Sequence, residues 1–148
     1  LAVAYPIEGI ELRQAGIKSP IMVLTAGTDF FNEIIDNDLE PGIPNLYSLK
    51  ALCAVLEKRG VTDFPIHLKL DSGMHRLGFM TDELEELMAF LKDCNLVNVK
   101  SIYSHLAAAD EPDSDDFTLG QIALFKENAD KLAESLGYRP MYHVLNSA

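Results

Sequence analysis

The most informative part of the sequence is Pro65-Ile-His-Leu-Lys-Leu-Asp71, which continues into Ser-Gly-Met-His-Arg-Leu-Gly-Phe79. Apolar and polar side chains alternate along residues 65–71, so the two kinds face opposite sides of a strand. The apolar set is Ile66, Leu68 and Leu70, and the polar set is His67, Lys69 and Asp71. A solvated antiparallel strand would show this pattern, whereas a parallel strand covered on both faces is normally apolar throughout. In a parallel sheet, the polar face would therefore look into a functional interior.

Segments with strand character recur on both sides of this stretch, with helical segments between them. The predicted strands cover residues 1–5, 21–25, 65–71, 99–106 and 141–145, with a weaker candidate at 39–43. Apolar residues at helical spacing predict helices around residues 7–15, 29–35, 49–56, 84–91 and 122–132. Regular alternation of this kind favours parallel strands joined by right-handed helical crossovers. An open doubly wound sheet and a (β/α)₈ barrel both satisfy it.

Several residues are candidates for helix boundaries. Gly60, after Lys58 and Arg59, is typical of a left-handed helix end, and Gly137 can end the last helix. Thr81 is a candidate N-cap for the helix at 84–91. The last helix carries the predicted stripe Ile122, Phe125, Ala129 and Leu132. The spacing of Thr118 and Gln121 fits a capping box at its start.

Composition narrows the class of protein. The 148 residues are 48% hydrophobic and carry 12 Lys+Arg against 23 Asp+Glu, a net charge of −11. This acidic balance argues against nucleic-acid and anionic-membrane partners, and no apolar run approaches the roughly 20 residues that span a bilayer. Two cysteines, Cys53 and Cys94, favour a reduced, cytoplasmic protein. No nucleotide-binding glycine motif follows any predicted strand, and no metal site is predicted.

Polar residues with donor groups follow three of the predicted strands. Arg76 lies between Gly73 and Gly78 after the strand at 65–71, His105 follows the strand residues Val99–Ser104, and Asn146-Ser147 follow the last strand. The Arg76 guanidinium either reaches inward to an anion or an oxygen, or forms an ordinary ion pair with Asp71. Ligands of parallel α/β proteins bind at the carboxyl ends of the strands, so the convergence of these residues favours a binding site.

Three motifs occur in order along the chain: His67-Leu-Lys-Leu-Asp-Ser-Gly-Met-His-Arg-Leu-Gly-Phe79, Ser104-His-Leu-Ala-Ala-Ala-Asp-Glu-Pro-Asp113 and His143-Val-Leu-Asn-Ser-Ala148. Together they resemble the N-terminal barrel domain of the alanine racemase family, whose enzymes depend on pyridoxal 5'-phosphate. The resemblance implies an α/β fold, a partial TIM (β/α)₈ barrel of the PLP-binding type with five to six βα units. Residues 1–148 would form one partial domain, without the family's C-terminal β-domain.

The resemblance also implies roles for individual residues. Arg76 matches the arginine that hydrogen-bonds the phenolic oxygen of the cofactor, and His105 matches the histidine that packs against its pyridine ring. Ser147 matches a phosphate-binding residue, with Asn146 beside it. Lys69 matches a lysine that is carbamylated in some members. A carbamate there would replace repulsion between two cations, Lys69 and Arg76, with a charge-assisted hydrogen bond.

Other family residues lie outside the chain in this comparison. The Schiff-base lysine belongs upstream of Leu1 and the catalytic tyrosine downstream of Ala148, so we expect no catalytic residue within 1–148 and no activity of this chain alone. We expect both ends to be truncations, because a barrel of this type needs roughly 250 residues. The match departs from the family at Ser72, where threonine is common, and at His75, where glycine is common. Histidine lacks the backbone freedom of glycine, so the loop is expected to bend differently.

The implied function is interconversion of L-alanine and D-alanine for peptidoglycan synthesis, in a cytoplasmic homodimer or in a fusion with a cell-wall (Mur-type) ligase. We expect the uncovered edge strands of the isolated chain to promote association. One alternative is a non-catalytic barrel protein that binds and handles PLP. The other is a racemase of a different amino acid.

Overall fold

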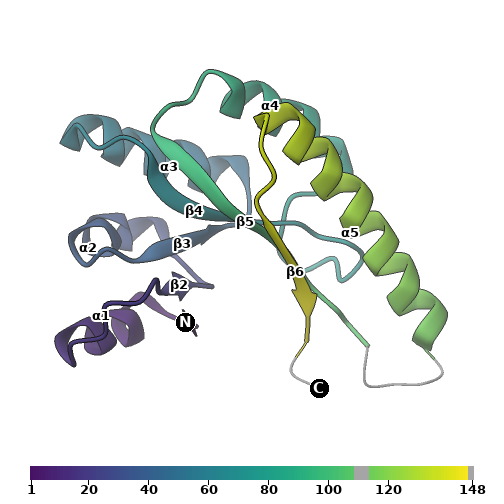
Figure 1. Cartoon of the computed structure of the whole chain (residues 1–148), viewed down its shortest axis with the longest axis horizontal. Helices are drawn as coiled ribbons and strands as arrows, with labels where there is room; N and C mark the ends of the chain where they lie inside the picture. Colours follow the sequence, from purple (N-terminus) through teal and green to yellow (C-terminus); the bar gives the residue numbers. More distant parts are fainter. Residues whose placement is uncertain (109–113, 147–148) are drawn as a thin grey trace. The chain divides into compact units, whose positions relative to one another are not determined.

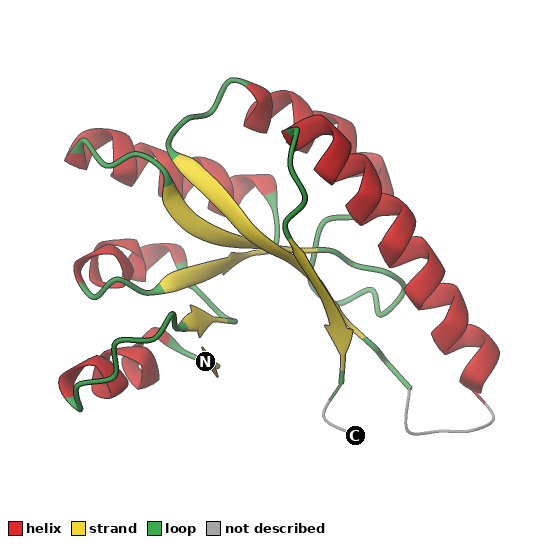
Figure 2. Ribbon diagram, viewed as in Figure 1, coloured by secondary structure: helices red, strands yellow, loops and turns green. Residues whose placement is uncertain are grey.

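The computed structural model describes residues 1–108 and 114–146. Strands and helices alternate along the chain (Figures 1 and 2). The elements are β1 (Ala2–Val3), α1 (Pro6–Gln14), β2 (Met22–Val23), η1 (Thr28–Phe30), α2 (Phe31–Asp36), β3 (Glu40–Ile43), α3 (Leu46–Arg59), β4 (Phe64–Lys69), η2 (Thr81–Glu83), α4 (Leu84–Lys92), β5 (Val97–His105), α5 (Asp115–Leu136) and β6 (Met141–Leu145). The strands follow one another in sheet order β1-β2-β3-β4-β5-β6. The predicted α/β alternation, including the weak strand at 39–43, is confirmed.

The chain divides into two compact units, and the division runs through β4 and β5. The first unit comprises Leu1–His67 and Asn95–Val99, and the second comprises Leu68–Cys94 and Lys100–Ala148. In the first unit β1 pairs with β2 and β2 with β3, both in parallel. Its core contains Ile21, Ile34, Leu39, Ile43, Leu49, Leu52, Leu56 and Ile66, all fully buried.

Both ends of helix α3 in the first unit are set by local sequence. The side chain of Asn45 accepts a hydrogen bond from the Ser48 N–H, which caps the first turn. The stripe at 49–56 is buried against the strands, as predicted. The helix ends at Gly60, which has the left-handed φ of 66° expected there.

The first two strands are shorter than the predicted 1–5 and 21–25. Backbone hydrogen bonds nevertheless continue the parallel pairing past β1 and β2, from Leu24 N–H to Val3 O and from Thr25 N–H to Ala4 O. The apolar runs therefore set the extent of the pairing, and only the central residues form regular strand.

In the second unit β5 and β6 pair in parallel, with Ser101 opposite Met141 and His105 opposite Leu145. Helices α4 and α5 pack side by side (Figure 1). Their buried side chains are Leu84, Leu87 and Leu91 on α4 and Phe125, Ala129 and Leu132 on α5. α5 ends at Gly137 in the left-handed conformation, as predicted.

Two predicted helix starts are wrong. The turn at Thr81–Glu83 is a 3₁₀ turn before α4, and the Thr81 hydroxyl accepts a hydrogen bond of 2.8 Å from the Asn128 side chain instead of capping. α5 begins at Asp115, so Thr118 lies inside it and forms no capping box with Gln121. The buried stripe of α5 also starts at Gln121 rather than Ile122, since Gln121 is 1% exposed and Ile122 is 37% exposed.

The alternation along β4 resolves the two interpretations of residues 65–71. The apolar side chains are buried, with Ile66 and Leu68 at 0% exposure, but the polar face is covered as well, with His67 at 8% and Asp71 at 5%. A solvated antiparallel strand would leave that face in water. His67 and Asp71 are therefore covered and Lys69 is half-buried, and His67 binds the Glu40 carboxylate of β3 across 2.9 Å.

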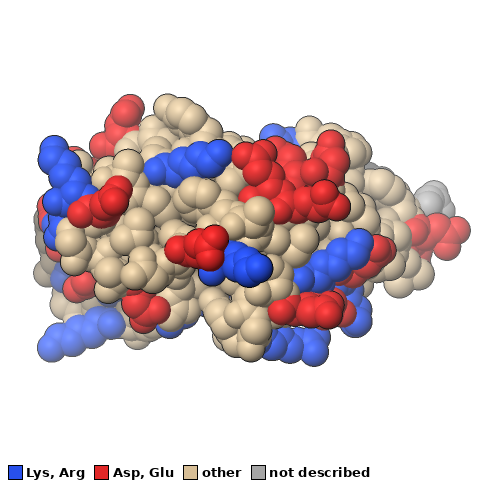
Figure 3. Space-filling view, turned by 90° about the horizontal axis from the view of Figure 1, so that it is seen from above, with Lys and Arg blue, Asp and Glu red and all other residues tan. Residues whose placement is uncertain are grey.

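The charged residues on the surface reflect the acidic composition. Figure 3 shows acidic side chains gathered in a group on the face that it draws. Among the described residues, no helix is long and apolar enough to cross a membrane.

Candidate functional site

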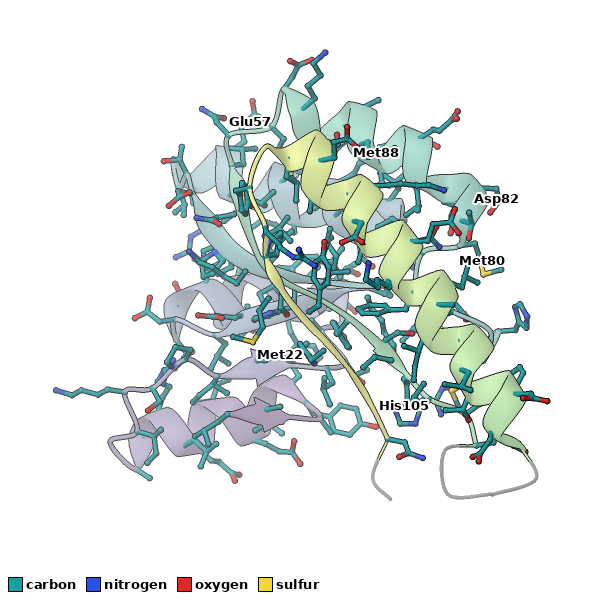
Figure 4. The ribbon with its side chains drawn as sticks, turned by 45° about the vertical axis from the view of Figure 1, so that its right-hand side comes forward. Met22, Glu57, Met80, Asp82, Met88 and His105 are labelled. Carbon is teal, nitrogen blue, oxygen red and sulfur yellow. The ribbon has the colours of Figure 1, made fainter. Side chains whose placement is uncertain are left out.

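The candidate site lies in the second unit, where β4 and β5 end. Lys69 is the last residue of β4 and His105 the last of β5, and Figure 4 shows His105 at that end of its strand. Arg76 lies in the loop that follows β4. A small pocket of about 10 Å³ opens here, lined by Lys69, Leu70, Asp71, Met74, Arg76, Leu77, Ser104 and His105. The residues predicted from the strand ends therefore share one pocket.

The loop after β4 is built around the buried Asp71 carboxylate. Its oxygens accept backbone hydrogen bonds from Gly73 at 2.9 Å, His75 at 3.0 Å and Arg76 at 3.0 Å. Burial alone would raise the pKa of Asp71, but these three bonds and the nearby His75 ring outweigh it, so the pKa is lowered. Within residues 1–108 and 114–146, the exposed Arg76 guanidinium forms no ion pair with this carboxylate, which overturns the ion-pair interpretation.

The same loop returns to the strand that it left. Phe79 N–H donates to Lys69 O at 2.8 Å, and Asp71 N–H donates to Phe79 O at 2.9 Å. Gly78, with φ 136°, makes this closure possible, because a Cβ there would lie 2.6 Å from the Asp71 backbone nitrogen. His75 takes a left-handed φ of 52°. His75 thus adopts the conformation for which glycine is favoured. The replacement of glycine by histidine therefore does not require the loop to bend differently.

Two buried serines tie the loop to β5. Ser104 Oγ donates to Leu70 O at 2.7 Å, and Ser72 Oγ lies 2.9 Å from Ser104 Oγ. A hydroxyl has one proton, so Ser104, which already donates, must accept from Ser72. The side chain at position 72 uses only its hydroxyl here, and both serine and the threonine common in the family supply one.

Three basic side chains converge on the pocket. Burial lowers the pKa of Lys69, and Arg76 lowers it further, while Asp71 acts in the opposite direction. Burial also lowers the pKa of His105, and Arg76 and Lys69 add to the effect. The Lys69 ammonium lies 5.8 Å from the centre of the Tyr103 ring. An anion placed among these groups would relieve their mutual repulsion, so the arrangement favours a negatively charged ligand.

The remaining predicted residues follow β6. The register places Leu145 opposite His105, so the half-buried Asn146 comes directly after the residue that pairs with the end of β5. Ser147 lies outside the described residues.

Sequence reasoning missed the contribution of Gln121 to this region. Its side chain accepts a hydrogen bond from Ala107 N–H at 3.0 Å and donates a longer one of 3.5 Å to His105 O. A signal was present, because Gln121 precedes Phe125 by four residues and Ala129 by eight, which places it on the apolar stripe of α5. A polar residue on a buried stripe needs partners, and those partners are the backbone beside His105.

Comparisons with known proteins agree over the whole chain. The family model described as "Alanine racemase, N-terminal domain" matches residues 1–148. The curated alanine racemases of Sorangium cellulosum and a Geobacter species are 39% and 36% identical, over 100% and 99% of this chain and 40% of each relative. The solved structure of Clostridium difficile alanine racemase in complex with cycloserine is 32% identical, with a TM-score of 0.88, covering 97% of this chain and 40% of that one.

These matches show the fold and the family. The parallel sheet with its helices is part of the TIM barrel of the alanine racemase N-terminal domain. The chain spans about 40% of the length of the curated relatives that it matches. It belongs to the alanine racemase N-terminal domain family.

Proposed function

We propose that this chain supplies the cofactor-holding part of a PLP-dependent alanine racemase, which interconverts L-alanine and D-alanine for peptidoglycan synthesis. The observation that carries the proposal is the convergence of Lys69, Arg76 and His105 on one pocket at the carboxyl ends of β4 and β5. The family membership of the whole chain supports it.

The residues present fit this cofactor. PLP is an anion with a phosphate and a phenolic oxygen. The pocket is lined by three basic groups, and an anion would relieve the repulsion that, after burial, lowers the pKa values of Lys69 and His105. The pocket has room for about one water molecule, which suits a single oxygen atom rather than a ring. Arg76 would hold the phenolic oxygen, His105 would contact the pyridine ring, and Asn146 and Ser147 would bind the phosphate.

The division of labour follows from these roles. When bound, PLP supplies an electron sink that makes the α-proton of an amino acid acidic. This chain's own residues bind and orient the cofactor: Asp71 fixes the backbone that carries Arg76, and the two serines fix that backbone against β5. The two groups that the resemblance implies for moving the proton, a lysine and a tyrosine, would lie outside residues 1–148.

Further parts of the proposal concern the whole protein. The cycloserine complex of the Clostridium difficile relative supports an amino acid as substrate, and the curated alanine racemases that the chain resembles support alanine. A homodimer, a cytoplasmic location and a fusion with a Mur-type ligase stay predictions, as does association of the isolated chain through its edge strands.

The proposal is tested by an assay of the full-length protein. With PLP it should convert L-alanine to D-alanine and the reverse, detected by chiral chromatography, and residues 1–148 alone should give no turnover. Turnover of serine or another amino acid in place of alanine would change the substrate. PLP binding without any racemisation would indicate a PLP-handling protein, and turnover by residues 1–148 alone would contradict the assigned division of labour.

The Arg76→Met variant of the full-length protein gives a sharper result. Loss of a charge-assisted hydrogen bond should raise the half-saturating PLP concentration about 30-fold. Arg139→Met is the matched control, since Arg139 is an exposed arginine of the same unit that contacts Asp130, and it should change the value less than about twofold. Equal values for both variants would exclude Arg76 from the cofactor site.

The proposal includes carbamylation of Lys69. The lowered pKa of Lys69 increases the fraction of neutral amine, which attacks CO₂ to form an N–C bond and releases one proton. The resulting anion would bind Arg76. In ¹³C-bicarbonate, NMR should detect a protein carbamate signal that Lys69→Gln abolishes and that Lys100→Gln, a change at an exposed lysine of β5, preserves. An unmodified Lys69 in PLP-bound protein would contradict this prediction.

A further inference from the structure

Gln121 is a buried amide that the cofactor roles above do not use. It projects from α5, is 1% exposed, and forms its two hydrogen bonds with backbone atoms on β5 and the segment after it. Ala107 N–H donates to its Oε1 at 3.0 Å, and its Nε2 donates to His105 O at 3.5 Å. The amide thus binds the backbone at His105 itself and two residues further on.

The same side chain also contacts the loop that carries Arg76. A Cβ added to Gly73 would lie 3.4 Å from Gln121 Cγ and 3.7 Å from its Nε2, so the glutamine packs directly against this glycine. Gly73 is in turn held by the Asp71 carboxylate, which also holds Arg76 N–H. One side chain therefore touches the segments that present two of the three basic groups, Arg76 and His105, to the pocket.

The orientation of the amide is determined by its partners. The oxygen must face the Ala107 N–H and the nitrogen must face the His105 carbonyl, because the reverse placement would bring like groups together. A buried side chain that is hydrogen-bonded through both the oxygen and the nitrogen of its amide is held in one orientation.

We propose that Gln121 is a positioning residue, which holds His105 and the Arg76 loop in register with each other for an anionic cofactor. This inference rests on the proposed function for the identity of the cofactor. The placement of His105 does not depend on it and can be measured separately.

Asn128 provides a matched control on the same helix. It is also a buried amide at 1% exposure, and its hydrogen bond goes to Thr81 Oγ1, at the start of the turn before α4. Gln121→Met keeps an unbranched side chain against Gly73 but removes both hydrogen bonds. Asn128→Leu removes a buried amide whose hydrogen bond goes to Thr81.

The first experiment follows the His105 imidazole by NMR in the 148-residue chain. Burial lowers the pKa of His105, so a segment released by Gln121→Met should let the ring reach water and raise its titration midpoint by about 0.3 pH unit or more. Asn128→Leu should leave the midpoint unchanged. Equal midpoints in wild type and Gln121→Met, or equal shifts in both variants, would overturn the proposal.

A second measurement does not depend on any variant folding. The Ala107 amide of the unaltered chain should exchange its hydrogen at least about 100-fold more slowly than a free peptide amide, because Gln121 binds it. An unprotected Ala107 amide would overturn the proposal by itself.

The third readout tests the link to the cofactor. In the full-length protein, Gln121→Met should raise the half-saturating PLP concentration about fivefold, against less than twofold for Asn128→Leu. If unaltered protein does not bind PLP, the proposed function fails while the His105 titration still decides the role of Gln121. If PLP binds and both variants weaken it equally, the positioning role fails.

Discussion

Gly78→Ala should lower the free energy of unfolding by about 4 kcal/mol. Gly78 has a φ of 136°, which side chains rarely adopt, and its missing Cβ would lie 2.6 Å from Asp71 N and Leu70 C. Both neighbours are backbone atoms of the strand end, so no side-chain rotation can relieve the overlap. The loop must open instead.

Opening the loop would also break its closure. The two hydrogen bonds that join Phe79 to Lys69 and Asp71 depend on the close approach at Gly78. Urea denaturation measures the loss, and the melting temperature should fall by about 10 °C for a chain of this length. Arg76 would then leave its position, so anion binding should be lost together with stability.

Gly120→Ala is the matched control for this substitution. Gly120 is an exposed residue inside α5, and a Cβ there would meet nothing within 4 Å. Alanine favours the helix over glycine, so this variant should gain about 0.5–1 kcal/mol. A Gly78→Ala variant within about 1 kcal/mol of the unaltered chain would show that the loop can close by another route.

Much of the fold could be predicted from local patterns. The apolar runs and helical stripes specify the order of elements, and Gly60 and Gly137 mark the ends of α3 and α5, because left-handed helix ends have a strong local signature. The predicted helix starts at Thr81 and Thr118 are wrong for different reasons: the Thr81 hydroxyl accepts from a distant side chain, and α5 begins three residues before Thr118. The Thr81 hydroxyl binds Asn128, which is 47 residues away along the chain.

Part of the candidate site could also be predicted from local patterns. Arg76 and His105 stand out because they follow strands in a parallel arrangement, and the carboxyl ends of such strands meet. The helical spacing of α5 places Gln121 on its buried stripe, but it does not reveal the partners of the amide, since these are backbone groups of another segment. The choice between an open sheet and a barrel was not decided by periodicity, which both satisfy. It required the family motifs and the matching solved structure.

Asp71→Asn should produce the second large effect, a loss of about 3 kcal/mol at pH 7. Asparagine has the same shape, and its oxygen can still accept from Gly73 and His75. Its amide nitrogen, however, would replace the oxygen that now accepts from Arg76 N–H at 3.0 Å, which leaves two donors facing each other in a buried position. The loop would lose the charge-assisted bond that fixes the backbone of Arg76.

The stability difference between the unaltered chain and Asp71→Asn should depend on pH. The pKa of Asp71 is lowered in the folded chain, so its ionised form stabilises the fold fully above the unfolded value near pH 4. That contribution disappears as the pH falls below about 4, through the folded pKa. Urea titrations from pH 7 to pH 2 should therefore show unaltered chain and Asp71→Asn farthest apart at neutral pH and converging in acid.

Asp130→Asn controls for a carboxylate whose pKa is also lowered but whose surroundings are water. Asp130 is 41% exposed and contacts Lys126 on the surface of α5, so its replacement should change stability much less than Asp71→Asn. The contrast isolates what burial adds, because both carboxylates accept hydrogen bonds and only Asp71 accepts them from three backbone groups at once. A constant gap between the unaltered chain and Asp71→Asn from pH 7 to pH 2 would mean that the ionised carboxylate does not hold the loop.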